Sequence, residues 1–421
     1  MSQTLIQKIV SDVTGIKNPE EGSIVFVEPH RILTHDNSAA IIEWFNTIGA
    51  KKVWNPDKIF IALDHAVPPP DEKKALNHKI IREFVKEQGI KHFYDCGVGI
   101  CHQVLPQEGH VKPGVVIFGS DSHTTSHGAL GAAGIPIGRT EAASIWAIGQ
   151  TWLKIPETIK ITMKGKLQPT VFAKDLILHI IGEMHSDGAS YKSVEYLGEG
   201  AENLSISERL TISNMTAEMD GKAGIFPADK VTDAFLQGRI EEPYKKIQPD
   251  KDANYFLEKE FNLDEITPVV AKPHNVDNVS PISEIPETEI DVGLLGTCTN
   301  GRLDDLTAAA KVLKGKKIKE GVRLLVYPAS REILLEGMKT GVIQILVEAG
   351  GELSVPACGP CLGAYGGVLA PEETAISSAN RNFKGRMGCK TGTSIYLGSP
   401  ATVAASVIAG KIVEPPKEVF K

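Results

Sequence analysis

Short apolar runs alternate with longer amphipathic stretches along most of this chain, and this alternation limits its fold more than any other feature. Runs that predict buried strands lie at residues 24–27, 59–63, 115–118, 292–295, 322–327 and 352–355. Helical patterns follow several of them: one begins after Asn37 or Ser38, and others begin near Leu303 and Ser330. Strands that alternate with helices in this way predict an α/β fold.

Aspartate, histidine and cysteine residues, which can catalyse reactions or bind metals, directly follow these predicted strands. Asp64 and His65 follow the run that ends at 63, and Asp121 to His123 follow the run that ends at 118. Cys298 and Cys358 come just after the runs that end at 295 and 355. Because the sites of open α/β sheets lie beyond the carboxyl ends of the strands, we expect these side chains to form the functional site.

Three cysteines are the strongest candidates within this set. Cys298 lies in a Gly-Thr-Cys-Thr-Asn run, and Cys358 and Cys361 are the ends of a Cys-Gly-Pro-Cys run. Three thiolates at one point would hold a metal or an iron–sulfur centre and leave one coordination position open for a substrate. Six cysteines in 421 residues are too few for a disulfide scaffold, so we expect a reducing cytoplasm.

The cysteines alone leave two other interpretations open. Cys-Gly-Pro-Cys is also the dithiol motif of thioredoxin-like redox proteins, although here it lies far from the first strand. A structural zinc site with Cys389 as the fourth ligand is the second alternative. Cys96 and Cys101 have no assigned role.

Histidines next to carboxylates form a second candidate group. They occur at Asp64-His65, at Cys101-His102 and at Asp121-Ser122-His123. A carboxylate fixes the tautomer of an imidazole and raises its basicity, as proton transfer near neutral pH requires. One such histidine would be an ordinary core residue, but a group of them at strand ends indicates acid–base chemistry.

The arginine-rich run from Asn380 to Arg386 is a candidate for substrate capture. Arg381 and Arg386 lie five residues apart in a predicted loop, and guanidinium groups bind carboxylates through paired hydrogen bonds. The glycines at 128, 131 and 134 are better explained by close packing than by phosphate binding. Lys390 does not directly follow a glycine, so we reject a phosphate-binding loop there.

Length and charge set the remaining limits. A chain of 421 residues predicts several domains, and we place them at 1–156, 157–266 and 267–421, with a polar linker at 268–286. The net charge of −7 gives no basic face for nucleic acid. No stretch approaches the roughly 20 apolar residues of a membrane span, and we expect no membrane association.

Taken together, these motifs resemble the aconitase family. The matching segments are residues 97–104, 121–124, 296–302, 358–363 and 380–388. The resemblance extends over essentially the whole chain. The combination of segments, in this order, is far more specific than any one of them.

The resemblance implies three α/β domains around a central iron–sulfur cleft, without the fourth, swivelling domain of full-length members. It implies a [4Fe–4S] cluster held by Cys298, Cys358 and Cys361, with one iron that lacks a protein ligand. That iron would bind the hydroxyl and a carboxylate of a small 2-substituted malate, from which water is removed and to which it is added back.

The resemblance also implies roles for individual residues. The histidine–carboxylate pairs would be Asp64 with His65, Asp121 with His102, and Glu195 with His123, and His65 would be the acid for the departing hydroxyl. Substrate would be bound by Ser122, Arg381, Arg386 and His35, the last at a position where full-length members carry glutamine. Asn300 and Asn380 would lie close to the cluster.

A partner follows from the same resemblance. The fourth domain of the family carries a serine base, and the sequence ends at Lys421 before such a domain. We therefore expect a separate small subunit and little activity without it. Outside enzymes, the alternative is a zinc- or cluster-binding protein that recognises RNA or another partner.

Overall fold

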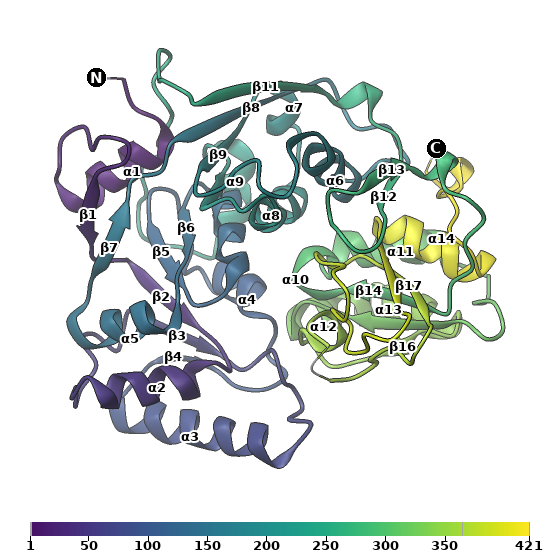
Figure 1. The fold of residues 1–421 in the computed structure, drawn as a ribbon, viewed down its shortest axis with the longest axis horizontal. Coiled ribbons are helices and arrows are strands. Elements are labelled where there is room, and N and C mark those ends of the chain that lie inside the picture. The colour runs from purple at the N-terminus through teal and green to yellow at the C-terminus, as the bar shows by residue number, and fades with distance from the viewer. Residues whose placement is uncertain (1, 364, 421) are drawn as a thin grey trace.

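The computed structural model describes residues 2–363 and 365–420. Its strands form sheets of five, four and seven strands and a two-stranded ribbon. In Figure 1 the five- and four-stranded sheets lie in one lobe at the left, and the seven-stranded sheet lies in a second lobe at the right. The predicted α/β fold is confirmed.

The first sheet has the order β4-β3-β2-β5-β6, and every neighbouring pair is parallel. Its strands are β2 (Arg31–Thr34), β3 (Ile59–Ala62), β4 (His92–Tyr94), β5 (Val116–Gly119) and β6 (Ala133–Pro136). Helices α2 (Ser38–Thr47), α3 (Glu72–Gln88), α4 (Cys101–Gln107) and α5 (Arg139–Ile148) connect or cover them. Because the strands are parallel, their carboxyl ends all lie along one edge.

An N-terminal helix and the two-stranded ribbon lie beside the first sheet. Helix α1 (Leu5–Thr14) buries its apolar face, and β1 (Ile24–Val27) pairs antiparallel with β7 (Thr151–Lys154). Helix α3 begins at its cap Asp71, whose side chain accepts a hydrogen bond from Lys74 N at 2.8 Å. None of the helices in the described residues combines the length and the apolar character that crossing a bilayer requires.

The second sheet has the order β10-β9-β8-β11 and is also parallel throughout. Its strands are β8 (Thr158–Lys164), β9 (Ser193–Leu197), β10 (Ala223–Ile225) and β11 (Leu257–Asn262), with helices α6 (Ala173–Met184), α7 (Glu199–Glu202), α8 (Ile206–Met215) and α9 (Lys230–Leu236). A Cβ on Gly128 would collide with the carbonyl of Gly224 in β10, which confirms close packing at this glycine.

The third sheet has the order β13-β12-β18-β17-β14-β15-β16. Its strands are β12 (Val269–Ala271), β13 (Val279–Pro281), β14 (Val292–Gly296), β15 (Arg323–Tyr327), β16 (Glu352–Leu353), β17 (Thr374–Ser377) and β18 (Ser394–Leu397). From β18 to β16 the neighbours are parallel, whereas β12 pairs antiparallel on both sides. Helices α11 (Leu303–Leu313), α12 (Arg331–Lys339), α13 (Val342–Glu348) and α14 (Pro400–Ala409) complete this lobe.

The structure corrects the predicted linker. Residues 268–286 contain β12, β13 and a short 3-10 turn, so this stretch is the antiparallel edge of the third sheet. Its prolines misled the sequence analysis, because proline is tolerated in edge strands such as β13, which ends at Pro281. The three sheets lie within the three predicted segments, while the exact domain boundaries stay predictions.

Backbone hydrogen bonds join the first lobe to the third sheet beside the strand ends. Ile100 N donates to Ala329 O at 2.9 Å, and Cys358 N donates to Asp64 O at 2.9 Å. The second bond joins a cysteine of the third sheet to the residue that directly precedes His65. The carboxyl edges of two parallel sheets therefore meet.

The core of the first lobe offers a test of this packing. Trp146 on α5 is fully buried and stacks on Phe84, whereas Trp152 on β7 is 47% exposed. We expect Trp146→Ala to lower the free energy of unfolding by about 3–5 kcal/mol, because it leaves a large cavity. Trp152→Ala is the matched control, with an expected loss below about 1 kcal/mol. Urea unfolding measures both, and equal losses would contradict the packing.

Candidate active site

The three candidate cysteines lie just beyond strand ends of the third sheet. Cys298 is in the single-turn helix α10 (Thr297–Asn300) after β14, and Cys358 and Cys361 flank the 3-10 turn η5 (Gly359–Cys361) after β16. They are 7%, 8% and 4% exposed. Gly359 has a φ of +52°, and a Cβ there would strike the ring of Tyr327. Glycine is therefore required between these two thiols.

Side-chain amides and a guanidinium surround the sulfurs. Asn380 contacts two of them: its Nδ2 lies 3.6 Å from Cys298 Sγ, and its Oδ1 lies 3.6 Å from Cys361 Sγ. Asn214 Nδ2 donates to Cys298 Sγ at 3.4 Å, and Arg386 donates to Cys361 Sγ at 3.5 Å. The structure thus brings these thiols into one buried, donor-rich site, in which Cys298 and Cys358 belong to one cluster of buried side chains with Ile100.

This donor set fits an iron–sulfur centre. N–H groups directed at sulfur are the outer contacts that tune such centres, and Arg386 Nε is buried without a hydrogen-bond partner among the described residues. A thioredoxin-like dithiol needs a thiol with a depressed pKa. Here burial raises the pKa of Cys358, the first thiol of that motif. The direction of this pKa shift therefore does not support the redox interpretation.

The other cysteines have different surroundings. Cys96 Sγ lies 3.6 Å from His78 Nδ1, on the outer side of the first lobe. Cys101 is buried, and its backbone N–H donates to Asp64 Oδ2 at 2.7 Å. The Sγ of Cys389 lies 4.0 Å from the carbonyl of Thr391. In the described residues, none of these three thiols forms a hydrogen bond with the side chain of Asn380 or Arg386.

Asp121 connects the histidines at the edge of the first sheet. Its Oδ1 accepts from His102 Nε2 at 2.7 Å and from the backbone N–H of His123 at 2.8 Å. Its Oδ2 lies 3.4 Å from His65 Nε2 and 4.0 Å from His35 Nε2. Although burial opposes its charge, the hydrogen bonds from these histidines hold the pKa of Asp121 well below its usual range. The predicted pairing of Asp121 with His102 is present.

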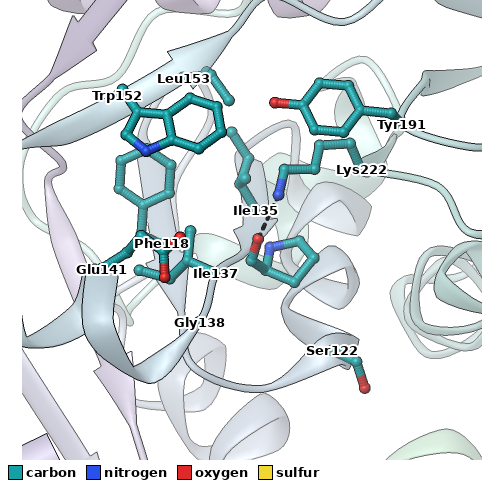
Figure 2. A pocket seen from close by; sticks show the side chains of 11 residues that line it. Phe118, Ser122, Ile135, Ile137, Gly138, Glu141, Trp152, Leu153, Tyr191 and Lys222 are labelled. Atoms are coloured by element: carbon teal, nitrogen blue, oxygen red, sulfur yellow. Dashed lines mark hydrogen bonds between the residues drawn. The ribbon is translucent and has the colours of Figure 1, made fainter.

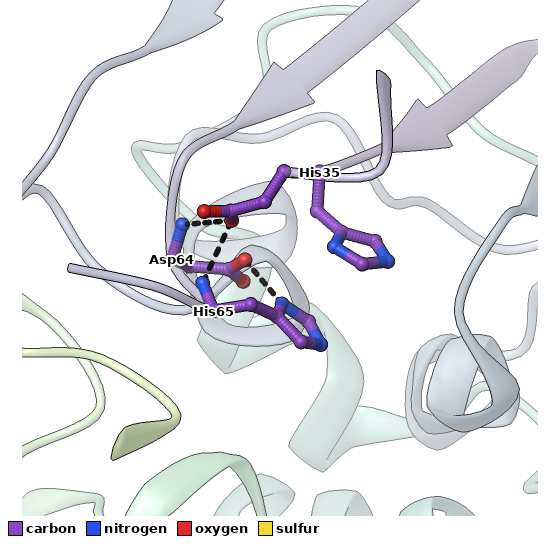
Figure 3. Close-up of side chains that lie close together, drawn as sticks. His35, Asp64 and His65 are labelled. Carbon is purple, nitrogen blue, oxygen red and sulfur yellow. Dashed lines mark hydrogen bonds and ion pairs between the residues drawn. The ribbon is translucent and has the colours of Figure 1, made fainter. Parts of the chain in front are cut away.

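The predicted pair of Asp64 and His65 is also present. Asp64 Oδ1 lies 2.6 Å from His65 Nδ1, and the ring of His35 stacks on that of His65 with centroids 3.8 Å apart (Figure 3). Burial and the charge of His65 lower the pKa of His35 to about 4, so this ring is neutral at physiological pH. Burial opposes protonation of His65 too, but Cys358 and the carboxylates hold its pKa well above the usual range.

These residues include a group with metal-ligand geometry. The ligand atoms of His35, Asp36, Asp64 and His65 lie within 4.8 Å of one another. Asp36 nevertheless accepts the backbone N–H groups of residues 64, 65 and 66 and a hydrogen bond from His78, so both its oxygens are engaged. We interpret Asp36 as the residue that fixes the turn after β3.

The structure corrects the predicted partner of His123. His123 Nε2 lies 2.7 Å from Glu218 Oε1, and Arg381 Nε lies 3.0 Å from Glu218 Oε2. Glu195 accepts instead from the backbone N–H of Leu5 at 2.5 Å and from Tyr255 at 2.9 Å. Burial raises the pKa of Glu195 to about 7. Glu195 was misplaced because it lies within β9 rather than beyond a strand end.

The remaining predicted residues are distributed around the same site. Arg381 is paired with Glu218, while Asn300 donates to Asp305 Oδ1 at 2.8 Å and keeps a buried Oδ1 without a partner in the described residues. Asn380, which was expected close to the cluster together with Asn300, contacts Cys298, and so does Asn214, which was not predicted.

Ser122 lies at the rim of a separate pocket beside the first sheet. Figure 2 shows this pocket, with Trp152 and Lys222 on its walls and Lys222 Nζ donating to Pro136 O at 2.7 Å. The side chain of Ser122 points away from the other side chains drawn, and its Oγ lies 3.4 Å from His123 Nδ1. Ser122 therefore belongs with the histidine group.

Sequence reasoning missed Asn214 and Glu218. Both come from one segment, because Asn214 is in α8 and Glu218 is in the 3-10 turn η2 (Thr216–Met219) that continues it. No pattern in the sequence marks them, because the burial of most polar residues of α8, including Arg209 and Ser213, is visible only in the structure. Polar groups buried in this way must be bonded within the protein.

The chain matches a known protein family. The model of the aconitase family (aconitate hydratase) matches residues 7–410, and the chain belongs to this family. A probable 3-isopropylmalate dehydratase large subunit of Methanothermobacter thermautotrophicus is 45% identical over 416 residues, with 99% of each chain covered. A probable methanogen homoaconitase large subunit of Methanosarcina mazei is 47% identical over 386 residues, which cover 91% of this chain and 98% of that one.

Two further comparisons agree with the family. The 3-isopropylmalate dehydratase large subunit of Clostridium kluyveri is 43% identical over 421 residues, with both chains fully covered. Among solved structures, aconitase X of Thermococcus kodakaraensis superposes with a TM-score of 0.50 at 14% identity, with 93% of each chain covered. At that identity the likeness concerns the fold alone.

The different surroundings of Glu195 and Glu218 predict opposite effects of pH on stability. The pKa of Glu195 is raised to about 7, so the folded state binds the proton more tightly and stability falls as pH rises from about 4.5 to about 7. Glu195→Gln removes that loss. We expect its free energy of unfolding, relative to the parent protein, to increase by up to about 3 kcal/mol between pH 5 and pH 8.

Glu218→Gln is the matched control. His123 and Arg381 outweigh burial and lower the pKa of Glu218, so its contribution is complete above its unfolded pKa and is lost only as the pH falls below that range. The variant should therefore be less stable by an amount that stays constant from pH 5 to pH 8. Urea unfolding at several pH values measures both, and a constant offset for Glu195→Gln would contradict the assignment.

Proposed function

We propose that this chain is the large, cluster-binding subunit of a 3-isopropylmalate dehydratase. This hydro-lyase interconverts 2-isopropylmalate and 3-isopropylmalate by dehydration and rehydration in leucine biosynthesis. One observation carries the proposal: buried thiols of the third sheet meet the Asp121–histidine group of the first sheet, and Cys358 N bonds directly to Asp64 O. Relatives that match along nearly their whole length have this name.

Cys298, Cys358 and Cys361 would hold a [4Fe–4S] cluster. When bound, the cluster supplies a Lewis-acid iron without a protein ligand, which makes hydroxide a feasible leaving group. The donors already directed at the sulfurs would stabilise their negative charge. Three buried thiols with fixed polar neighbours support this assignment over a flexible surface site.

The histidines would transfer the protons in this reaction. Asp64 fixes Nδ1 of His65 and leaves Nε2 facing Asp121, so His65 is placed to hand a proton to the departing hydroxyl. The negative charges of Cys358, Asp64 and Asp121 raise the pKa of His65, which favours the protonated form that an acid requires. Asp121 orients the ring of His102, and Glu218 orients the ring of His123, whose backbone N–H also donates to Asp121.

Arg381 and Arg386 would bind the carboxylates of the substrate. Glu218 aligns Arg381 from one side, and Arg381 stays a quarter exposed, with a side-chain exposure of 26%. Arg386 lies against Cys361, so a carboxylate bound there would be next to the cluster. His35, stacked on His65, would line the same substrate position.

The relatives are named large subunits, and a small subunit with the serine base would complete the site. All six cysteines are free thiols, in keeping with a reducing cytoplasm. Homoaconitase large subunit is the second candidate, because a relative with that name is 47% identical. The two activities use the same chemistry on malates that differ in their 2-substituent.

The cluster assignment predicts a colour. Anaerobically reconstituted protein should be brown, with a broad absorbance band at about 400 nm, and should contain iron and sulfide. Cys298→Ser should lose the band while its circular dichroism stays unchanged, because the thiolate ligand is lost and the fold is not. Cys389→Ser is the control and should keep the band. A Cys298→Ser protein with a full complement of iron would refute the ligand assignment.

The substrate assignment predicts a ranking. With the proposed small subunit added, kcat/KM should be highest for isopropylmalate and lower for homocitrate and citrate, all assayed side by side. Without that subunit, activity should fall at least about 10²-fold, because the base is missing. A higher kcat/KM for homocitrate would favour homoaconitase, and undiminished activity of the chain alone would refute the two-subunit proposal.

A further inference from the structure

Lys174 is a fully buried lysine on the far side of the thiol site. It is the second residue of α6, and its side chain is inaccessible to solvent. Its Nζ donates to the carbonyl of Ser378 at 2.8 Å and to that of Ala379 at 2.5 Å. These carbonyls directly precede Asn380 and Arg381. A helix of the second sheet therefore holds the backbone of the third sheet where it enters the active site.

The two residues that follow these carbonyls both contact residues of the active site. Asn380 contacts the sulfurs of Cys298 and Cys361, and Arg381 pairs with Glu218. A third link is made by Ser378, whose Oγ accepts the backbone N–H of Gly296, two residues before Cys298. Lys174 thus fixes one short segment that touches two thiols, the turn before Cys298 and a substrate-binding arginine.

The surroundings of Lys174 raise the free energy of its positively charged form. A buried ammonium loses its hydration, and the first turn of a helix carries positive partial charge from the backbone N–H groups. Burial lowers the pKa of Lys174 to about 7. Two neutral carbonyls could be tied by a neutral donor such as glutamine, so the hydrogen bonds alone do not explain a lysine here.

Negative charge near Lys174 does explain it. The groups that favour its charged form are Cys361 first, then Asp175, Asp305 and Cys298. Asp175 is buried, engaged by the backbone N–H groups of Phe172 and Val269, and has a pKa raised to about 7 by burial, so it is a poor counter-ion. The thiols become permanently negative only when they bind a metal centre as thiolates.

We propose that Lys174 is a positioning residue that holds the segment from Ser378 to Arg381 in the thiol site and balances part of the thiolate charge. This inference rests on the proposed iron–sulfur site. The alternative is a purely structural tie between α6 and β17, in which the charge of the lysine has no influence on the thiols.

The test uses the full chain reconstituted anaerobically with iron and sulfide. Lys174→Gln keeps a neutral donor and removes the charge, and Lys174→Arg keeps the charge. We expect the glutamine variant to show a more negative midpoint potential of the cluster, because reduction adds negative charge that the lysine no longer offsets. It should also lose iron to a chelator several-fold faster. Lys79→Gln, on the exposed face of α3, is the control and should match the parent protein.

The results distinguish a lysine that balances the thiolate charge from one that only ties α6 to β17. A glutamine variant that is less stable to urea but has the parent potential and rate of iron loss overturns the proposal in favour of a structural tie. The arginine variant should keep the parent potential, and a clear negative shift in it would also overturn the proposal, whether or not the glutamine variant folds. If the parent protein binds no iron at all, it is the proposed function that fails.

Discussion

The carboxylate of Asp121 is the interaction on which the arrangement of this site depends. This one buried carboxylate bonds the ring of His102 and the backbone N–H of His123, and it faces Nε2 of His65 at 3.4 Å. Because Asp121 lies directly beyond β5, its position is set by the register of the parallel sheet, not by a flexible loop. The rigid sheet therefore fixes the positions of the side chains in the site.

Much of this arrangement could be predicted from the sequence because parallel strands end along one edge. Apolar runs located the strands, and Asp64, His65, Asp121 and the cysteines follow them. The same logic failed for Glu218 and Asn214, since nothing marks the point where a buried helix passes a distant strand end. Their side-chain partners at the site are 84 to 166 residues away in sequence.

The two errors have physical causes of the same kind. Glu195 was paired with His123 on a resemblance alone, whereas its strand directs the carboxylate toward Leu5 and Tyr255. The stretch at 268–286 was taken for a linker because of its prolines, although an edge strand tolerates them. In both cases the residue type was interpreted correctly and its tertiary surroundings were not, because long-range packing decides them.

The burial of the thiols also bears on how the protein would mature. Cys298 and the Cys358–Cys361 turn follow different strands, β14 and β16, which are separated in the sheet by β15. The three sulfurs converge only once that sheet has formed, so iron and sulfide would be delivered to a folded protein and not to a nascent chain.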